Sequence, residues 1–175
     1  MPLDQAFIDD CFYAPEALLL EEILEVNQET GRVVARMPVH AELPITRDQR
    51  VHPVKHPRHL SGGLMVHMTG MMGFAHAYFV LGLRHADGWI GYGAKIHEAK
   101  FANLALPGTP LILTADVIRQ RKMNNSIMVR YRFTFTQGEK LIYEGEQTAM
   151  WMKIDETHPI PEDRSGPSPV VTAGA

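Results

Sequence analysis

One apolar segment, residues 62–83, constrains the fold more than any other feature of this chain. Its length approaches that of a membrane-spanning helix. Four side chains with polar groups interrupt it, namely His67, Thr69, His76 and Tyr78. Apolar side chains occur nearly all round the helix that the segment would form, and such a helix is enclosed by other parts of the protein. The segment therefore predicts a buried core helix and not a membrane span.

The chain on either side of this segment has the patterns of β-strands. Before it, residues 17–39 predict a β-hairpin with strands at 17–26 and 32–39, although the leucines at 18–20 would also suit a short helix. After it, strands are predicted at residues 89–101, 111–122, 127–136 and 141–154. One helix can be covered on most sides only by a sheet that curls around it. The predicted fold class is therefore α+β, with an antiparallel sheet of five or six strands wrapped around one long buried central helix.

Length and composition predict a single domain at residues 1–154 followed by a flexible tail. A chain of 175 residues is within the range of one domain, and it can bury a sizeable core. Residues 155–175 are rich in proline, serine and glycine, which is typical of a flexible segment. The loop at residues 40–60 carries four histidines and three prolines, and a loop of this length in a compact domain is often functional.

Charge and cysteine content exclude several classes of protein. A net charge of -3 argues against a nucleic-acid partner, because such domains carry a basic excess. Cys11 is the single cysteine, so the chain can form neither an intrachain disulfide nor an all-cysteine zinc site. The first ten residues contain acids and no basic region, unlike a secretory signal. We therefore expect a cytoplasmic protein that does not insert into membranes.

Two stretches of the chain resemble the hotdog superfamily, and the resemblance covers residues 12–154. The hairpin at residues 17–26 leads through a loop rich in histidine and proline to Gly62-Gly63-Leu64-Met65, which is similar to the opening of the β-hydroxyacyl-ACP dehydratases. Residues 99–111 contain Pro107-Gly108 and resemble the strand of that family that ends in a Pro-Gly turn. The resemblance implies a hotdog fold and a substrate that is an acyl-CoA or an acyl carrier protein (ACP) thioester. It also implies a homodimer or a dimer of dimers, and no cofactor, since coenzyme A or phosphopantetheine is part of the substrate.

The catalytic acids of these families have no counterpart in this chain. Dehydratases carry a carboxylate on the central helix, where this chain has His67 or Met68, depending on which glycine is aligned. One group of hotdog thioesterases begins the helix with His-Gly-Gly and has an acid further along, where residues 61–63 are Ser-Gly-Gly and Gly70 stands at the acid position. Residues 49–86 contain no Asp or Glu. Neither catalytic pair is complete.

The start of the central helix is predicted to bind the thioester carbonyl. Free backbone N–H groups and the positive end of the helix dipole occur at a helix N-terminus. Ser61 can cap this helix, and Gly62 and Gly63 would let a carbonyl oxygen approach without a side chain in the way. These three residues are therefore the predicted oxyanion site, the alternative being a glycine turn that only starts the helix.

Histidines are the candidates for proton transfer. His56 and His59 precede the helix start, and His67 lies in its second turn, towards the expected acyl tunnel. The alternatives are solvated loop histidines and, for His67, a core histidine bonded to a backbone carbonyl. No metal site is predicted, because Pro53 and Pro57 prevent a regular helix that would align the loop histidines.

A basic strand end provides the remaining predicted contact. Arg119 and Arg121, with Lys122 beside them, would meet the phosphates of coenzyme A or an acidic carrier protein, unless they are simply solvated. The function predicted from all these features is acyl thioester hydrolysis, because hydrolysis depends least on the missing carboxylate. The alternatives are a β-hydroxyacyl thioester dehydratase or hydratase, with His67 in place of the acid, and a non-catalytic acyl-thioester binding protein.

Overall fold

The computed structural model describes residues 1–52 and 54–154 of the chain, so the predicted tail at 155–175 lies outside the described residues. The helices are α1 (Gln5–Asp9), α2 (Pro15–Leu18), α3 (Gly62–Phe79) and a short 3-10 helix, η1 (His85–Asp87). The strands are β1 (Glu22–Val26), β2 (Val33–Met37), β3 (Trp89–Phe101), β4 (Leu111–Met123), β5 (Ser126–Gln137) and β6 (Lys140–Lys153).

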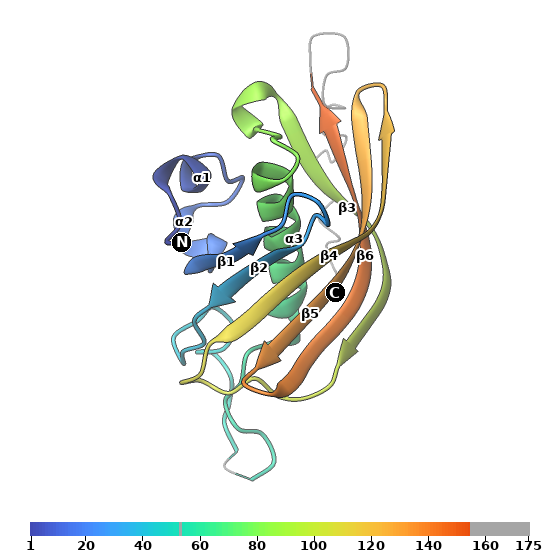
Figure 1. Ribbon diagram of the computed structural model, residues 1–175. Coiled ribbons are helices and arrows are strands. Elements are labelled where there is room, and N and C mark those ends of the chain that lie inside the picture. The colour runs from blue at the N-terminus through green and yellow to red at the C-terminus, as the bar shows by residue number, and fades with distance from the viewer. Residues whose placement is uncertain (53, 155–175) are drawn as a thin grey trace, which may run out of the picture.

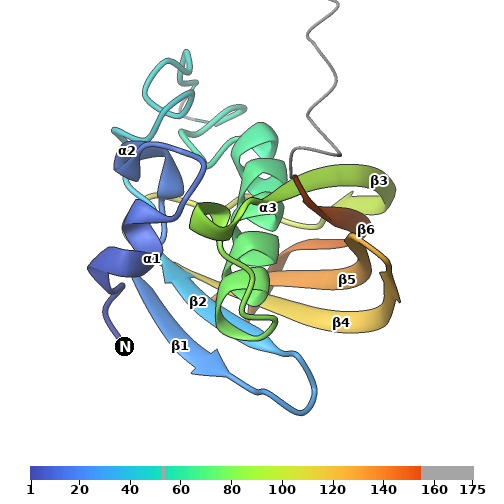
Figure 2. The ribbon, with the colours of Figure 1, turned by 90° about the horizontal axis from the view of Figure 1, so that it is seen from above.

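The six strands form one antiparallel sheet in the order β1-β2-β4-β5-β6-β3. The sheet curls around α3, which runs along its concave face (Figures 1 and 2). This confirms the predicted α+β arrangement of one sheet wrapped around one long buried helix. The four strands after the helix lie within one residue of their predicted bounds, because long strands with period-2 patterning are strongly specified by local sequence.

Helix α3 begins where the sequence predicts and is buried on most sides. Ser61 is its N-cap, and its Oγ accepts a hydrogen bond from the Leu64 N–H at 3.4 Å. Twelve of its residues are buried, from Leu64 to Tyr78. The chain then turns at Gly82, whose φ of +66° lies in the left-handed region that glycine tolerates. The helix therefore ends soon after Phe79, and the chain can return to the sheet.

The first predicted strand is too long. Pro15 occupies the first turn of α2, a position that proline favours, and Leu18 is buried. Leu19 then adopts a left-handed conformation with φ of 56°, which ends the helical turn, and β1 begins only at Glu22. The short helix considered for the leucines at 18–20 is thus partly correct.

The N-terminal segment covers the side of α3 that the sheet leaves open (Figure 2). Phe7 stacks on Phe74 and Phe79, with ring centroids 5.0 and 4.8 Å apart. The buried carboxylate of Asp10 accepts hydrogen bonds from the backbone N–H groups of His85 and Ala86, at 2.9 and 3.0 Å. These contacts tie the segment to the last turns of α3 and to η1, which follows it.

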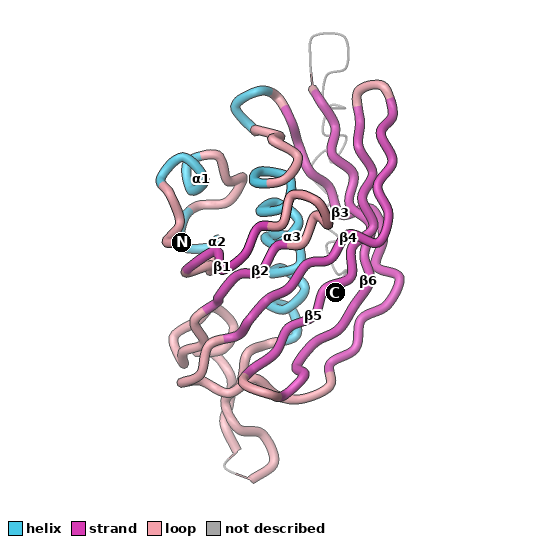
Figure 3. The backbone as a smooth tube through the Cα atoms, viewed as in Figure 1, coloured by secondary structure: helices cyan, strands magenta, loops and turns pink. Residues whose placement is uncertain are grey.

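The sheet ends on one side in a long exposed strand. Among the described residues, β3 pairs with β6 alone, and its residues are exposed from Tyr92 onward. The histidine-rich loop before α3 lies at the opposite end of the molecule from the η1 turn, below the start of the helix (Figure 3). The exposed residues of β3 therefore form one edge of the described sheet.

Candidate functional site

A cavity of about 440 Å³ lies between α3 and the strands β3, β5 and β6. The N-terminal segment contributes Phe12 and Tyr13 to its wall. Gly70 and Gly73 open it along the helix: a Cβ at Gly70 would have no atom within 4 Å, and one at Gly73 would meet only the Tyr131 ring, at 4.0 Å. No Asp or Glu of the described residues lines this cavity. Gly70, which the resemblance aligns with the acid of one group of hotdog thioesterases, therefore faces open space.

His67 is the one predicted catalytic histidine that lines the cavity among the residues described. Its Nε2 lies 2.7 Å from the Ala17 carbonyl oxygen. Because a carbonyl oxygen only accepts hydrogen bonds, Nε2 carries the proton and Nδ1 keeps the free lone pair. The Tyr13 ring packs edge-on against the imidazole, with centroids 5.0 Å apart. The carbonyl bond considered for a structural histidine is thus present, and it also fixes the tautomer of a half-buried side chain at the cavity wall.

Thr69 and Gln147 form a second polar group on the cavity wall, which was not among the residues predicted from the sequence. The Thr69 Oγ1 lies 2.6 Å from the Val66 carbonyl oxygen and 2.9 Å from Gln147 Oε1, so its one proton is shared between two acceptors. Gln147 Nε2 donates to the Tyr143 hydroxyl at 3.1 Å and has a second N–H for another partner. The period-2 alternation of β6 could have identified Gln147, because it places this residue on the inward face of the sheet with Tyr143 and Trp151.

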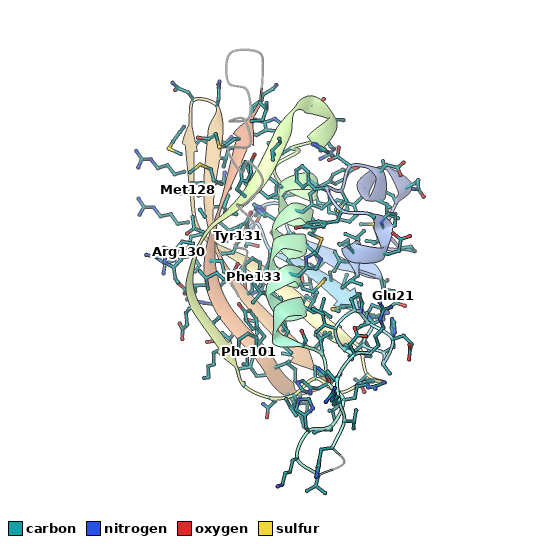
Figure 4. All side chains as sticks on the ribbon, turned by 180° about the vertical axis from the view of Figure 1, so that it is seen from behind. Glu21, Phe101, Met128, Arg130, Tyr131 and Phe133 are labelled. Atoms are coloured by element: carbon teal, nitrogen blue, oxygen red, sulfur yellow. The ribbon has the colours of Figure 1, made fainter. Side chains whose placement is uncertain are left out.

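A third polar group stands deeper in the core. The Tyr131 hydroxyl lies 2.8 Å from His76 Nδ1, and both residues are 1% exposed. Burial lowers the pKa of His76 to about 4 and raises that of Tyr131. The Trp151 indole N–H interacts with the Tyr131 hydroxyl and opposes the rise in its pKa, although the two groups do not meet the geometry of a good hydrogen bond. Figure 4 shows Tyr131 and Phe133 between the sheet and α3.

The predicted oxyanion site lies outside the cavity wall. Gly62 is covered by the Phe101 ring, whose nearest carbon is 3.0 Å from where a Cβ would stand, while Gly63 is exposed. Ser61 caps the helix by accepting from Leu64, as its sequence position predicts. Within the described part of the chain, the backbone N–H groups of Gly62 and Gly63 have no acceptor. The role of this helix start as an oxyanion site stays a prediction.

His56 and His59 lie together, away from the cavity wall. Their ring centroids are 5.0 Å apart, and backbone hydrogen bonds join His56 to His52. His59 Nδ1 lies 2.8 Å from the Pro57 carbonyl oxygen and therefore donates to it. The structure thus brings two of the three predicted histidines into one loop and the third into the cavity.

Arg119 and Arg121 lie on the outer face of the sheet. Leu111, Leu113 and Ala115 of β4 face the core, and continued alternation would direct the two arginines inward as well. A β-bulge between Val117 and Arg119 reverses the alternation, so Arg119 stands opposite Arg130 and Arg121 opposite Met128. Met128 and Arg130 point away from α3 (Figure 4). The cavity and the arginines therefore occupy opposite faces, and a contact of the arginines with the substrate stays a prediction.

No set of three or more His, Cys, Asp or Glu side chains in residues 1–52 and 54–154 is arranged to hold a metal ion. In the same part of the chain, no helix combines the length and the apolar character of a membrane span.

No protein-family model matches this sequence, and no curated protein sequence matches it. Among solved structures, the chain is similar to the dehydratase heterocomplex ApeI:P from Xenorhabdus doucetiae, with a TM-score of 0.59 and 12% identity, over 90% of this chain and 94% of that chain. It is also similar to a mutant of thioesterase PA1618 from Pseudomonas aeruginosa (TM-score 0.56, 15% identity, 88% of this chain and 96% of that chain). A mutant of the fluoroacetyl-CoA-specific thioesterase FlK, in complex with fluoroacetate and CoA, has a TM-score of 0.56 and 16% identity, over 71% of this chain and 94% of that chain. At these identities the likeness shows a shared fold.

Proposed function

Because this chain has the hotdog fold, we propose that it hydrolyses acyl thioesters of coenzyme A or of acyl carrier protein. The observation that carries the proposal is His67, an imidazole with a fixed tautomer in the wall of a cavity of about 440 Å³. Cavities of this size with apolar walls and a few polar groups are typical of small-molecule sites. The apolar wall would take the acyl chain, and the polar groups would surround the thioester.

The hydrolytic step assigns a role to each polar group. His67 Nδ1 takes a proton from water as the water oxygen attacks the thioester carbonyl carbon. The second N–H of Gln147 donates to the developing oxyanion. When the carbon–sulfur bond breaks, His67 returns the proton to the thiolate, and the products are a carboxylic acid and a free thiol. Tyr13 and the Ala17 carbonyl position the imidazole.

Two observations favour hydrolysis over the alternatives. Dehydration of a β-hydroxyacyl thioester needs a base and an acid, and within the described residues no carboxylate reaches the cavity wall. A protein that only binds thioesters would not need an imidazole held in one tautomer, whereas a general base does. Hydrolysis requires one proton shuttle, and His67 provides it.

The test is release of free thiol from a panel of acyl-CoA and acyl-ACP thioesters. We expect turnover by the wild type, a loss of at least 100-fold in kcat for His67→Ala, and binding of the acyl-CoA retained. His56→Ala and His59→Ala serve as matched controls, because both histidines lie outside the cavity wall. Loss of turnover in either of these two with His67→Ala unaffected would move the base to the loop. No thiol release, with crotonyl and hydroxybutyryl thioesters also unchanged, would leave a binding protein.

We further propose that the protein assembles as a homodimer through β3, and that a dimer of dimers can build on it. Among the strands that the structure describes, β3 is a 13-residue edge strand, and its free side carries backbone groups that no described strand pairs. Three of its apolar side chains are about half exposed, namely Tyr92, Ile96 and Phe101. Tyr92 and Ile96 also line the cavity, so a second copy on this edge would complete the wall.

A further inference from the structure

The inner part of the cavity contains more hydrogen-bond donors than acceptors. A neutral histidine, a phenol and an indole carry three protons on nitrogen or oxygen. His76, Tyr131 and Trp151 supply these groups, and one hydrogen bond of good geometry joins them, between His76 Nδ1 and the Tyr131 hydroxyl. Within the described residues, neither His76 Nε2 nor Trp151 Nε1 forms a hydrogen bond of good geometry, and the indole N–H interacts only imperfectly with the Tyr131 hydroxyl. Because buried polar groups are nearly always paired, this surplus needs an acceptor from outside the protein.

The tautomer of His76 decides which donor is left over. Its Nε2 faces the β1–β2 turn, since a Cβ at Gly31 would lie 3.2 Å from it. A proton on Nε2 would therefore be buried with no acceptor, and orphaned buried N–H groups are rarer than orphaned acceptors. The Nδ1–H tautomer avoids this by donating to the Tyr131 oxygen. The Tyr131 O–H must then find its acceptor elsewhere, and Tyr131 and Trp151 both line the cavity.

We propose that Tyr131 and Trp151 form a donor subsite in the inner part of the cavity, which recognises a neutral oxygen on the acyl group beyond the thioester carbonyl. The substrate class is therefore an acyl thioester with a keto, ether or hydroxyl oxygen along its chain, in preference to a plain alkyl chain. The subsite proposal rests on the proposed function for one point only, namely that the acyl chain enters the cavity with its far end towards Tyr131 and Trp151.

The residues that form the subsite carry no charge, and the one lysine or arginine of the described cavity wall, Lys95, is exposed on β3, so the recognised oxygen is neutral. Burial alone lowers the pKa of His76, and no charged neighbour contributes to the raised pKa of Tyr131. A carboxylate beside Tyr131 and Trp151 would be buried without a counter-charge in contact with it, which is unfavourable. A neutral carbonyl oxygen would instead pair the leftover donor, and a site built to hydrogen-bond a ligand rejects the analogue that lacks the oxygen.

The experiment measures binding of CoA thioethers that cannot be hydrolysed. S-hexyl-CoA is compared by calorimetry with three S-oxohexyl-CoA analogues, whose keto group stands at the third, fourth or fifth carbon. We expect one analogue to bind the wild type about tenfold more tightly than S-hexyl-CoA, the value of one net hydrogen bond of about 1.4 kcal/mol. Tyr131→Phe keeps the ring and should bring that ratio close to one, while binding of S-hexyl-CoA is little changed.

Each result then decides the proposal. A wild type that binds none of the keto analogues more tightly than S-hexyl-CoA, or that binds no analogue, overturns it without the need of a variant. A preference that persists in both Tyr131→Phe and Trp151→Phe also overturns it, and the second variant covers a first that fails to fold. The two proposals can fail separately. A keto preference in binding, with no thiol release from any thioester, would refute the hydrolase proposal and support the subsite. Turnover of hexanoyl-CoA and its keto analogues at equal kcat/KM, with no binding preference, would support the hydrolase and refute the subsite.

Discussion

Burial of His76 makes the stability of this protein depend on pH in a predictable window. The folded-state pKa of about 4 lies below the ordinary value of 6.5, because burial disfavours the charged imidazole. The unfolded chain therefore binds more protons between these two values, and the free energy of unfolding falls as pH falls through the window. The difference between the two pKa values corresponds to about 3 kcal/mol, fully lost below pH 4. About 2 kcal/mol of this is already lost at pH 5, because there the unfolded histidine is almost fully protonated and the folded one is not.

The assay is urea denaturation at a series of pH values from 7.5 to 4, at one protein concentration, for the wild type and His76→Gln. Glutamine keeps a hydrogen-bonding group beside Tyr131 and does not titrate, so the difference between the two free energies of unfolding isolates the histidine from every carboxylate in the chain. We expect this difference to shrink by about 2 kcal/mol between pH 7 and pH 5. A difference that stays constant across the window would show that His76 is charged or solvated in the folded state. The paired arrangement with Tyr131 would then be wrong.

Four further substitutions test the packing, the N-terminal anchor and the proposed dimer. Gly70→Ala should raise the free energy of unfolding by about 0.5–1 kcal/mol, because the position is open and alanine favours a helix. Gly91→Ala should lower the free energy of unfolding by about 1–3 kcal/mol, because the new Cβ would overlap the Trp151 indole. Thermal melts of both variants check this contrast, and two changes of the same sign would contradict it. Asp10→Ala should lower the free energy of unfolding by about 2 kcal/mol and expose the N-terminal segment to proteolysis, since the carboxylate accepts two backbone hydrogen bonds. A variant that stays uncut under conditions that cleave an exposed loop would show that Asp10 does not hold this segment in place. Ile96→Lys should convert the dimer to monomer in analytical ultracentrifugation, and a wild type that sediments as a monomer would remove the dimer proposal.

The positions of the secondary-structure elements follow largely from local sequence. Residues 62–83 predict a buried helix because apolar side chains surround it, and Ser61 marks its start. Strands β3 to β6 follow from alternation and from turn residues, which depend only on neighbours in the chain. The exception is the segment before β1, where Pro15 and the left-handed Leu19 form a helical turn that the apolar run concealed. The resemblance to the hotdog superfamily added the expectation of an acyl thioester substrate.

The identity of the groups around the cavity depends on contacts between distant parts of the chain. Thr69 and Gln147 are 78 residues apart, and His76 and Tyr131 are 55 apart, so no local pattern pairs them. Sheet register decides such pairs, and a shift of one residue sends a side chain to the opposite face. The bulge after Val117 makes that shift in β4 and carries the two arginines to the outer face.

The sequence by itself therefore determined that one helix is buried and that strands must wrap it, because the hydrophobic periodicity of a segment is a local property that shows which of its faces are buried. The sequence also contains three histidines that are candidates for the general base, and no local pattern distinguishes among them. Only the tertiary structure decided that His67 meets the cavity while His56 and His59 stay in their loop, since the choice depends on where the N-terminal segment folds back and presents the Ala17 carbonyl to the helix.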